Sequence, residues 1–357
     1  MATSFKIGVC SEIGELEGVI LHIPGREVEN MTPKNAERAL YSDILNLSVA
    51  QQEYNHFKGA LEKHAKVFLV SDLLKEVLGN QRAKEMLIDV IYKNENVEIG
   101  KGQLLSLPDS ELARQLIEGV VMPKDNLTKY FSKERYALQP LHNFFFTRDS
   151  AIAIRDKVLI ARMANQVRER ESLIMQTIFD YHPAFRTQTI NPFTQPNFSN
   201  NITIEGGDVL VVRDDILVIG MGIRTSSQGI DFILEQLESK DQIRHIIVQE
   251  LPHTPESFIH LDMVFTMLDY DSCMVFEPVI LRPNRYQTIH IAVDNGNVTI
   301  KNEENIVTAL TKLGIDLKPV YCGGTKDPWI MEREQWHSGA NFFALGPGKT
   351  IGYARNV

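Results

Sequence analysis

Proton-transfer chemistry is suggested by a histidine and an aspartate two positions apart, His260 and Asp262, in the apolar stretch 258–265. We expect this stretch to be a strand, in which side chains at i and i+2 share a face, so that the imidazole and the carboxylate point into one space. Such a pair can exchange protons with a substrate. A structural His–Asp pair or a turn at a strand end would give the same pattern.

Two further carboxylates, Glu205 and Asp208, enclose the glycine pair Gly206 and Gly207. Paired glycines permit positive φ angles and close approach of the backbone to a ligand. Glycine and aspartate are also common turn residues, so an ordinary turn that opens a hairpin is the alternative interpretation.

Amide and guanidinium groups occur near the ends of other predicted elements. Asn143 and Asp149 enclose three consecutive phenylalanines, and Asp149 precedes a predicted strand. Arg168 and Arg170 precede a predicted helix, where such a charge run usually marks a solvated helix start. Arg224 follows another predicted strand and precedes a helix.

These residues lie at equivalent places in a repeated pattern of a hairpin, a helix and a return strand. In the first unit these elements span residues 149–162, 169–181 and 186–190, in the second residues 208–220, 227–237 and 244–248, and a looser third unit begins at residue 262. The pattern predicts an α/β fold. Repeats arranged around a common axis would bring the carboxylates, the imidazole and the guanidinium groups into one site.

Other parts of the chain extend or interrupt the pattern. Strands are predicted at residues 19–23 and 66–70 with a long helix at 36–63 between them, whereas residues 71–138 show only helical spacing. A last hairpin is predicted at residues 341–354. The predicted organisation is a first module (1–70), a helical insertion (71–138) and the remaining modules (139–357).

The last module is predicted to be incomplete. Each earlier hairpin is followed by a helix and a strand that cover its apolar surface, and repeat units rarely bury their faces alone. We expect a natural protein of this pattern to continue beyond Val357 by about one helix–strand unit. A native stop codon after Val357 would contradict this expectation.

The composition indicates a globular protein without a nucleic-acid or membrane partner. Of the 357 residues 43% are hydrophobic and 23% are charged, and the net charge of -9 comes with no basic stripe that could neutralise phosphates. The N-terminus lacks a secretory apolar core, and no apolar run reaches the roughly 18 residues that span a bilayer, so a cytoplasmic location is predicted. The three cysteines are widely spaced and suggest neither a disulfide framework nor a zinc site.

Several carboxylates beside two arginines suit a small zwitterion with a cationic head and an anionic tail. A guanidinium is matched by carboxylates in bidentate, charge-assisted geometry, and an α-carboxylate is matched by arginine side chains. Free arginine carries both groups, so the predicted partner is L-arginine or a related guanidino compound.

From Ser11 onward, the chain resembles the arginine deiminases, which belong to the guanidino-group-modifying or amidinotransferase superfamily. The resemblance rests on motifs in the family's order and approximate spacing, namely residues 11–25, 143–149, Arg168 with Arg170 and Glu171, 204–208, 220–225, 260–262 and 333–336. It implies a five-fold α/β propeller of hairpin–helix–strand modules with a helical insertion. It also implies hydrolysis of L-arginine to citrulline and ammonia without a metal or cofactor, by a protein that can form homo-oligomers.

The resemblance further implies roles for single residues. In this family a cysteine thiolate attacks the guanidinium carbon, ammonia leaves, and water hydrolyses the thiouronium intermediate. Asp149 and Asp262 would bind the guanidinium, and Glu205 would support His260 as proton donor and later as base. The remaining substrate contacts would come from Asn143, Arg168, Arg224 and Asp208.

The sequence departs from the family at the nucleophile, which lies in a glycine-rich loop after the last hairpin, together with another arginine. Cys10, Cys273 and Cys322 do not match that position, and buried inert thiols are their expected state. Cys322, beside two glycines, is kept as a remote substitute. We expect a truncated copy of an active enzyme, with a non-catalytic arginine-binding relative as the alternative.

Other functions are compatible with parts of the sequence. A metal-dependent hydrolase could use His253, His260, Asp262 and Glu205, although no firm ligand spacing is present. Gly220 and Gly222 weakly resemble a nucleotide-binding loop in which Thr225 replaces the third glycine. Within the superfamily, an amidinotransferase or a dihydrolase acting on a related substrate remains an alternative.

Overall fold

The computed structural model describes residues 5–32, 36, 40, 41, 44–185, 187–194, 201–237, 244–294 and 296–354. The chain divides into two units, and each is assembled from separate segments. Unit 1 comprises Met1–Ile7, Glu17–Ala151 and Asn165–Thr189, and unit 2 comprises Gly8–Leu16, Ile152–Ala164 and Ile190–Val357. None of the helices in the described part of the chain combines the length and apolar character needed to cross a membrane.

Unit 1 begins with two parallel strands, β1 (Gly18–Leu21) and β2 (Lys66–Leu69), joined through α1 (Arg26–Glu29) and α2 (Leu47–Leu61). Both strands agree with the sequence prediction. Of the helix predicted at residues 36–63, α2 forms the part from Leu47 to Leu61, and residues 37–39, 42 and 43 lie outside the described part of the chain. Helix α2 begins at Leu47 because Asn46 has extended backbone angles and its side chain accepts a hydrogen bond from the Val49 amide.

The region predicted as a helical insertion is mostly helical. It contains α3 (Val70–Leu78), α4 (Gln81–Asn94), α5 (Lys101–Leu105), α6 (Asp109–Glu118) and α7 (Leu127–Phe131). The prediction of helical structure alone is wrong, since β3 (Val120–Val121) pairs with β4 (Tyr136–Leu138) in a short antiparallel ladder. Helices α3 and α4 both pack against α9 (Glu169–Tyr181), whose bounds are those predicted.

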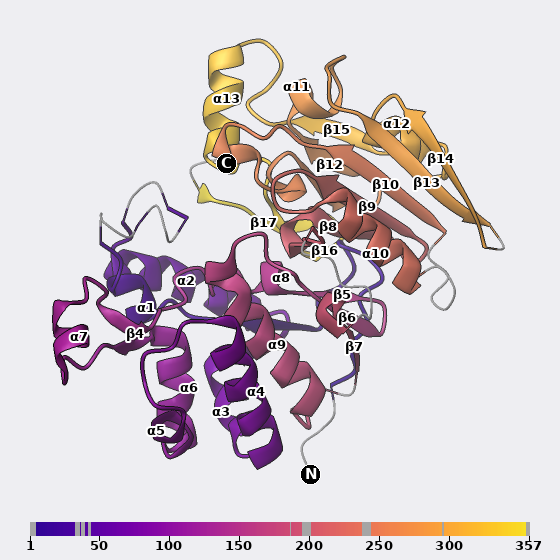
Figure 1. Ribbon diagram of the computed structural model, residues 1–357. Coiled ribbons are helices and arrows are strands. Elements are labelled where there is room, and N and C mark those ends of the chain that lie inside the picture. The colour runs from indigo at the N-terminus through magenta and orange to yellow at the C-terminus, as the bar shows by residue number, and fades with distance from the viewer. Residues whose placement is uncertain are drawn as a thin grey trace. The chain divides into compact units, whose positions relative to one another are not determined.

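Unit 2 contains a five-stranded sheet in the order β14-β13-β10-β9-β8, whose strands lie side by side in Figure 1. The strands are β8 (Val209–Arg213), β9 (Ile216–Met221), β10 (His245–Glu250), β13 (Thr288–Asp294) and β14 (Asn297–Glu303). Strands β8 and β9 form a hairpin, α10 (Ser227–Leu237) follows, and β10 returns parallel to β9. This confirms the second predicted unit, whereas the β13–β14 hairpin was not predicted.

The pattern recurs in two smaller sheets. Strands β5 (Ala151–Ile154), β6 (Lys157–Ile160) and β7 (Gln188–Ile190) are neighbours in that order, and Arg186, where the return strand was predicted to start, lies outside the described residues. In the other sheet, β11 (Phe265–Asp269) pairs antiparallel with β12 (Ser272–Val275), and β15 (Lys318–Tyr321) pairs parallel with β12.

The remaining elements of unit 2 are α11 (Glu277–Ile280), α12 (Ile306–Thr311), α13 (Pro328–Trp336), β16 (Phe343–Gly346) and β17 (Lys349–Ile351). Strands β16 and β17 form the predicted last hairpin. Residues 355–357 lie outside the described part of the chain.

The middle of the five-stranded sheet is apolar on both faces. Along β9, Ile216 and Val218 belong to one buried cluster, while Leu217 and Ile219 belong to another. Because both faces are covered, the strand is a continuous apolar run rather than an alternating one. The chain therefore has a mixed α/β fold in which helices and strands of the two smaller sheets contribute to the apolar clusters on both faces of this sheet.

Candidate active site

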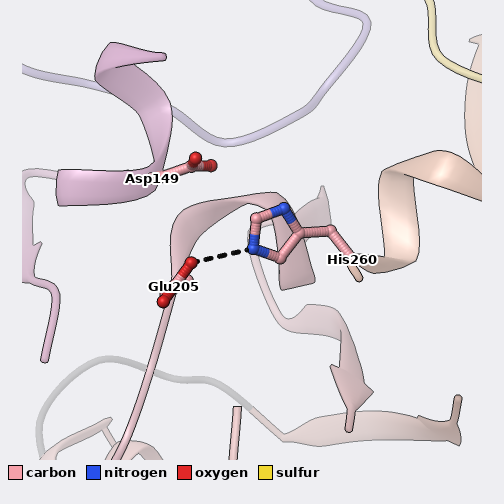
Figure 2. Close-up of side chains that lie close together, drawn as sticks. All are labelled: Asp149, Glu205 and His260. Carbon is pink, nitrogen blue, oxygen red and sulfur yellow. Dashed lines mark hydrogen bonds and ion pairs between the residues drawn. The ribbon is translucent and has the colours of Figure 1, made fainter. Parts of the chain in front are cut away.

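The centre of the candidate site in unit 2 is a buried histidine–carboxylate pair. His260 Nε2 lies 3.1 Å from Glu205 Oε2, and Figure 2 shows the imidazole directed at this carboxylate. Both side chains are buried. An ionised carboxylate against one ring nitrogen fixes the ring's orientation and favours a proton on that nitrogen.

His260 and Asp262 do not lie on a strand, so this prediction is wrong. His260 is extended, but it is followed by the 3-10 turn η5 (Leu261–Met263), and β11 begins only at Phe265. Asp262 is half-buried within that turn. The turn is held by a long-range contact, because the Leu261 amide donates a 2.9 Å hydrogen bond to Asp208 Oδ1.

Gly207 allows a close approach, but of the His260 side chain, whereas the prediction was close approach to a ligand. Gly206 and Gly207 belong to the 3-10 turn η3 (Gly206–Asp208). A Cβ on Gly207 would lie 2.5 Å from His260 Nδ1, so only glycine leaves room for the ring. Neither glycine has a positive φ, and that part of the prediction is wrong.

Glu205 is held by groups on three segments. Its Oε1 accepts a 3.0 Å hydrogen bond from the Ala164 amide, and both of its oxygens lie 3.4 Å from Arg224 Nη1. The Glu205 amide donates to Thr225 Oγ1. Arg224 and Thr225 follow β9, so the end of this strand positions the carboxylate that faces His260.

Asp208 is fully buried, and its Oδ1 supports the turn after His260. Within the described residues its Oδ2 has no hydrogen-bond partner. Burial raises the pKa of Asp208 to about 7, while His260, Thr225 and the Leu261 amide oppose this rise. The substrate contact predicted for Asp208 stays a prediction, and its observed contacts make it a support for His260.

A second group of charged residues lies in unit 1. Asp149 belongs to the one-turn helix α8 (Thr147–Ser150), Arg168 ends the 3-10 turn η1 (Gln166–Arg168), and Glu171 lies in the first turn of α9. Arg168 Nη1 donates a 2.8 Å hydrogen bond to Asp149 Oδ2. Its Nη2 donates to Glu171 Oε2 at 2.9 Å, and its Nε lies 3.2 Å from both Glu171 oxygens. We call these three residues the Arg168 cluster.

Other predicted residues of unit 1 surround the Arg168 cluster or serve the fold. The Asn143 carbonyl accepts a 3.4 Å hydrogen bond from Arg168 Nη2. Arg170 does not lie in a solvated helix start, because it is fully buried and binds Glu95 and the carbonyls of Leu116 and Gln139. Its role is structural.

Tyr41 was not predicted as part of any site. Its hydroxyl donates a 3.3 Å hydrogen bond to the His142 carbonyl. Burial raises the pKa of Tyr41, Arg168 opposes the rise, and Glu171 and Asp149 add to it. The sequence gives no signal for this tyrosine, since it lies about a hundred residues from its partners.

Comparisons with known proteins identify the family. The family model described as arginine deiminase matches residues 37–357. The chain belongs to the arginine deiminase family. Curated arginine deiminases that it resembles include that of Bacillus cereus, 33% identical over 98% of this chain and 89% of the relative, and that of Limosilactobacillus reuteri, 35% identical over 98% and 88%.

A solved structure with a similar fold is SxtG, an amidinotransferase from Microseira wollei in the saxitoxin biosynthetic pathway. It has a TM-score of 0.50 and 14% identity, and the match covers 95% of this chain and 83% of that chain. At this identity the likeness shows the fold of this arginine deiminase family member and not its substrate.

Two cysteines of this arginine deiminase family member, Cys273 and Cys322, are in states that disfavour nucleophilic attack. Burial raises the pKa of Cys273 to about 12. Burial, together with the charge of Glu334, raises the pKa of Cys322 to about 11. A thiol with such a pKa is protonated at neutral pH, and the thiolate is the nucleophilic form. Cys10 is exposed and precedes the first strand.

The ligand set considered for a metal-dependent hydrolase does not assemble in the described part of the chain. His253 is exposed, whereas His260 and Glu205 are buried. Among described residues, no three of His253, His260, Asp262 and Glu205 place ligand atoms within 4.8 Å of one another. In unit 2 the geometry thus favours proton transfer by His260 over metal binding by these four residues.

Proposed function

We propose that this protein hydrolyses L-arginine to citrulline and ammonia, as a hydrolase acting on C–N bonds of linear amidines. Membership of the arginine deiminase family over nearly the whole chain supports this function. The observation that carries the chemistry is the buried His260–Glu205 pair, because a histidine oriented by a carboxylate can give and take a proton in turn.

The chemistry requires a guanidinium carbon to accept a nucleophile although its charge is delocalised. Carboxylates that fix the guanidinium plane make attack by a thiolate feasible. We assign this binding to Asp149 and Asp262. His260 then donates a proton to the departing ammonia and afterwards takes a proton from the attacking water, while Glu205 holds its ring.

The amino-acid end of the substrate needs cationic and amide donors. The family resemblance assigns Asn143, Arg168 and Arg224 to this end, and Asp208 to the substrate as well. Burial raises the pKa of both Cys273 and Cys322, which disfavours either thiol as the attacking thiolate. Cys322 therefore stays only the remote candidate that its place beside two glycines suggested.

Three finer features remain proposals, and of these the propeller rests on the family resemblance. We propose the five-fold α/β propeller as the arrangement of the hairpin–helix–strand modules. We also propose a cytoplasmic location and homo-oligomer formation. The recurrent pairing of an antiparallel hairpin with a parallel return strand supports the modular part of this proposal.

Three alternative functions have clear discriminating observations. An amidinotransferase would move the amidino group to an amine acceptor instead of water, and a dihydrolase would release a second ammonia and ornithine. A non-catalytic relative would bind L-arginine without turnover. Only the non-catalytic relative needs no thiolate. The raised pKa values of Cys273 and Cys322 therefore favour it over the other two alternatives.

The deciding experiment incubates the purified 357-residue chain with L-arginine and measures citrulline and ammonia, with and without a chelator. Equal release of both products, unchanged by the chelator, supports hydrolysis, and His260→Asn should lower it by about 100-fold or more. Binding of L-arginine in calorimetry without turnover would support the non-catalytic alternative. Absence of binding would contradict both.

A further inference from the structure

The motif at residues 333–336, to which the sequence gave no role, lies on α13 and carries one buried amide. Gln335 is 2% exposed, whereas Arg333 and Trp336 of the same motif are exposed to solvent. A buried side-chain amide needs hydrogen-bond partners, because leaving it without them costs free energy. The partners of Gln335 therefore indicate what this motif does in the fold.

The Gln335 amide binds backbone carbonyls on both sides of residues 258–262, which we call the His260 segment. Its Nε2 donates a 2.7 Å hydrogen bond to the Ser257 carbonyl and a 3.3 Å hydrogen bond to the Met263 carbonyl. An amide NH2 group carries two hydrogens, so one side chain can serve both acceptors at once. Gln335 thus bridges the two ends of the segment that carries His260.

The His260 segment has little regular structure of its own. It runs from the 3-10 turn η4 (Glu256–Phe258) to η5, and His260 between the two turns has an extended backbone. The bonds within each turn are local, such as the 3.2 Å hydrogen bond from the Met263 amide to the His260 carbonyl. Such bonds fix each turn but not the distance between the turns, whereas the bridge from Gln335 fixes that distance.

Helix α13 is itself fixed close to the end of the His260 segment. Thr266 Oγ1 in β11 donates a 2.6 Å hydrogen bond to the Ala340 carbonyl, which follows α13. Met331 of α13 lies in the same buried apolar cluster as Leu261 and Phe265. Because these contacts hold the helix, the side chain of Gln335 projects from a rigid element, as a positioning group requires.

The place of the imidazole depends on the path of the His260 segment. His260 Nε2 lies 3.1 Å from Glu205 Oε2, and Figure 2 shows that the two side chains come from separate parts of the chain. The ring also lies close to Gly207. With Gly207 and Glu205 on two sides of the ring, a shift of the His260 backbone would change its contact with the carboxylate.

We propose that Gln335 is a positioning residue that holds His260 against Glu205 by bridging the two ends of the His260 segment. This inference rests on the proposed function, in which His260 gives and takes protons. The amide fixes the backbone on both sides of His260, the backbone places the imidazole, and Glu205 orients the ring.

The test substitutes Gln335→Met, which keeps an unbranched side chain of similar length and removes both donors. Hydrogen–deuterium exchange is measured on the full chain for the amides of Leu261, Met263 and Val264, each of which donates a hydrogen bond in the folded protein. Loss of two hydrogen bonds should make these amides exchange about 5- to 100-fold faster. Unchanged exchange in the folded variant would overturn the inference.

Turnover is measured on the same samples. A misplacement of about 1 Å at a catalytic group can lower turnover by about 100-fold, so kcat/KM for L-arginine should fall by about 10- to 100-fold in Gln335→Met. Faster exchange with an unchanged kcat/KM would show that the bridge does not serve the reaction, and would overturn the positioning role.

Gln249 provides a matched control in the same unit. It is buried in β10, its Nε2 donates a 2.9 Å hydrogen bond to the Glu250 carbonyl, and its Oε1 accepts a 2.7 Å hydrogen bond from Thr288. Gln249→Met also removes two hydrogen bonds, but it should leave kcat/KM and exchange in the His260 segment within about threefold. Equal effects of both substitutions on that segment would mean a general loosening of unit 2, and would overturn the inference.

Folding is checked by circular dichroism, and a milder variant keeps the test decisive. Gln335→Asn retains an amide that is one methylene shorter and cannot bridge both carbonyls. It should accelerate exchange less than Gln335→Met, and it is judged by the same criterion if Gln335→Met does not fold. Absence of turnover in the unmodified chain would refute the proposed function, and the exchange rates would then decide alone whether Gln335 holds the His260 segment.

Discussion

At the scale of single residues, the candidate site depends on a close contact between a side chain and the backbone. The His260 ring lies against Gly207, where a methyl group would meet Nδ1 at 2.5 Å, while its other nitrogen faces Glu205. The histidine is thus held from two sides. The orientation of the His260 ring therefore depends on the absence of a side chain at Gly207.

Gly207→Ala should displace the imidazole and leave most of unit 2 intact. A misplacement of about 1 Å at a catalytic group can lower turnover by about 100-fold. Citrulline release and thermal unfolding would be measured together. As the control, Gly59→Ala in α2 places its methyl group in open space, so activity should be unchanged and stability should rise by about 0.5–1 kcal/mol. Unchanged activity in Gly207→Ala would contradict the arrangement described here.

Asp208 gives a prediction on pH dependence. Burial raises its pKa from 3.8 to about 7, so the folded protein holds this proton more tightly than the unfolded chain. The fold therefore loses stability as pH rises from about 4 to about 7, and the loss is complete above that range.

Asp208→Asn removes this dependence because an amide does not ionise. Between pH 4.5 and pH 8, the variant should gain about 2–4 kcal/mol relative to the unmodified protein. Urea unfolding at the two pH values measures the difference. A constant offset between the two proteins at both pH values would mean that Asp208 is already ionised at pH 4.5.

At the scale of elements, the start of α9 combines chemistry and folding. Arg168, just before the helix, binds both Asp149 and Glu171, whereas Arg170 reaches Glu95 after α4 and the Leu116 carbonyl in α6. The helix thereby ties α4 and α6 to the segment that carries the Arg168 cluster. A run of charges that is usually solvated is buried here because each charge has a partner.

Arg170→Met should be strongly destabilising. It leaves Glu95 and two carbonyl groups without their partner, and breaking a buried pair from one side costs about 3–5 kcal/mol. Chemical denaturation measures this cost. Arg82→Met, at an exposed position of α4, should stay within about 0.5 kcal/mol of the unmodified protein. A similar small effect at Arg170 would show that water replaces its contacts.

At the scale of the whole molecule, the chain order does not follow the two units. Residues 8–16 precede most of unit 1 but belong to unit 2, where the Glu12 amide binds the Val211 carbonyl and the Leu16 amide binds the Leu345 carbonyl. Ile13 is completely buried in the same apolar cluster as Leu210 and Phe265. The N-terminal segment is therefore part of the core of unit 2.

Ile13→Ala should lower the free energy of unfolding by about 2–4 kcal/mol through lost burial and a residual cavity. Ile300→Ala, at an exposed position of the edge strand β14 in the same unit, should cost less than about 1 kcal/mol. Equilibrium denaturation of both variants checks this. Comparable costs at the two positions would show that residues 8–16 do not stabilise unit 2.

Much of the element pattern could be predicted because it is encoded in short-range periodicity. Helices α9 and α10 have the predicted bounds, and the hairpin of β8 and β9 lies where two apolar runs on either side of a charged turn placed it. The missed hairpin of β13 and β14 had a comparable signal, with alternating apolar residues before a turn at Gly296, whose φ is +80°.

The sequence by itself determined the α/β pattern, the family resemblance and the identity of His260, Glu205, Asp149 and Arg168 as residues of interest. Only the tertiary structure decided how they are held. Asp208 and Leu261 are 53 residues apart and close the turn after His260, and Arg168 joins Asp149 from 19 residues away. Local propensity acts over a few residues, so contacts of this separation depend on how the elements pack.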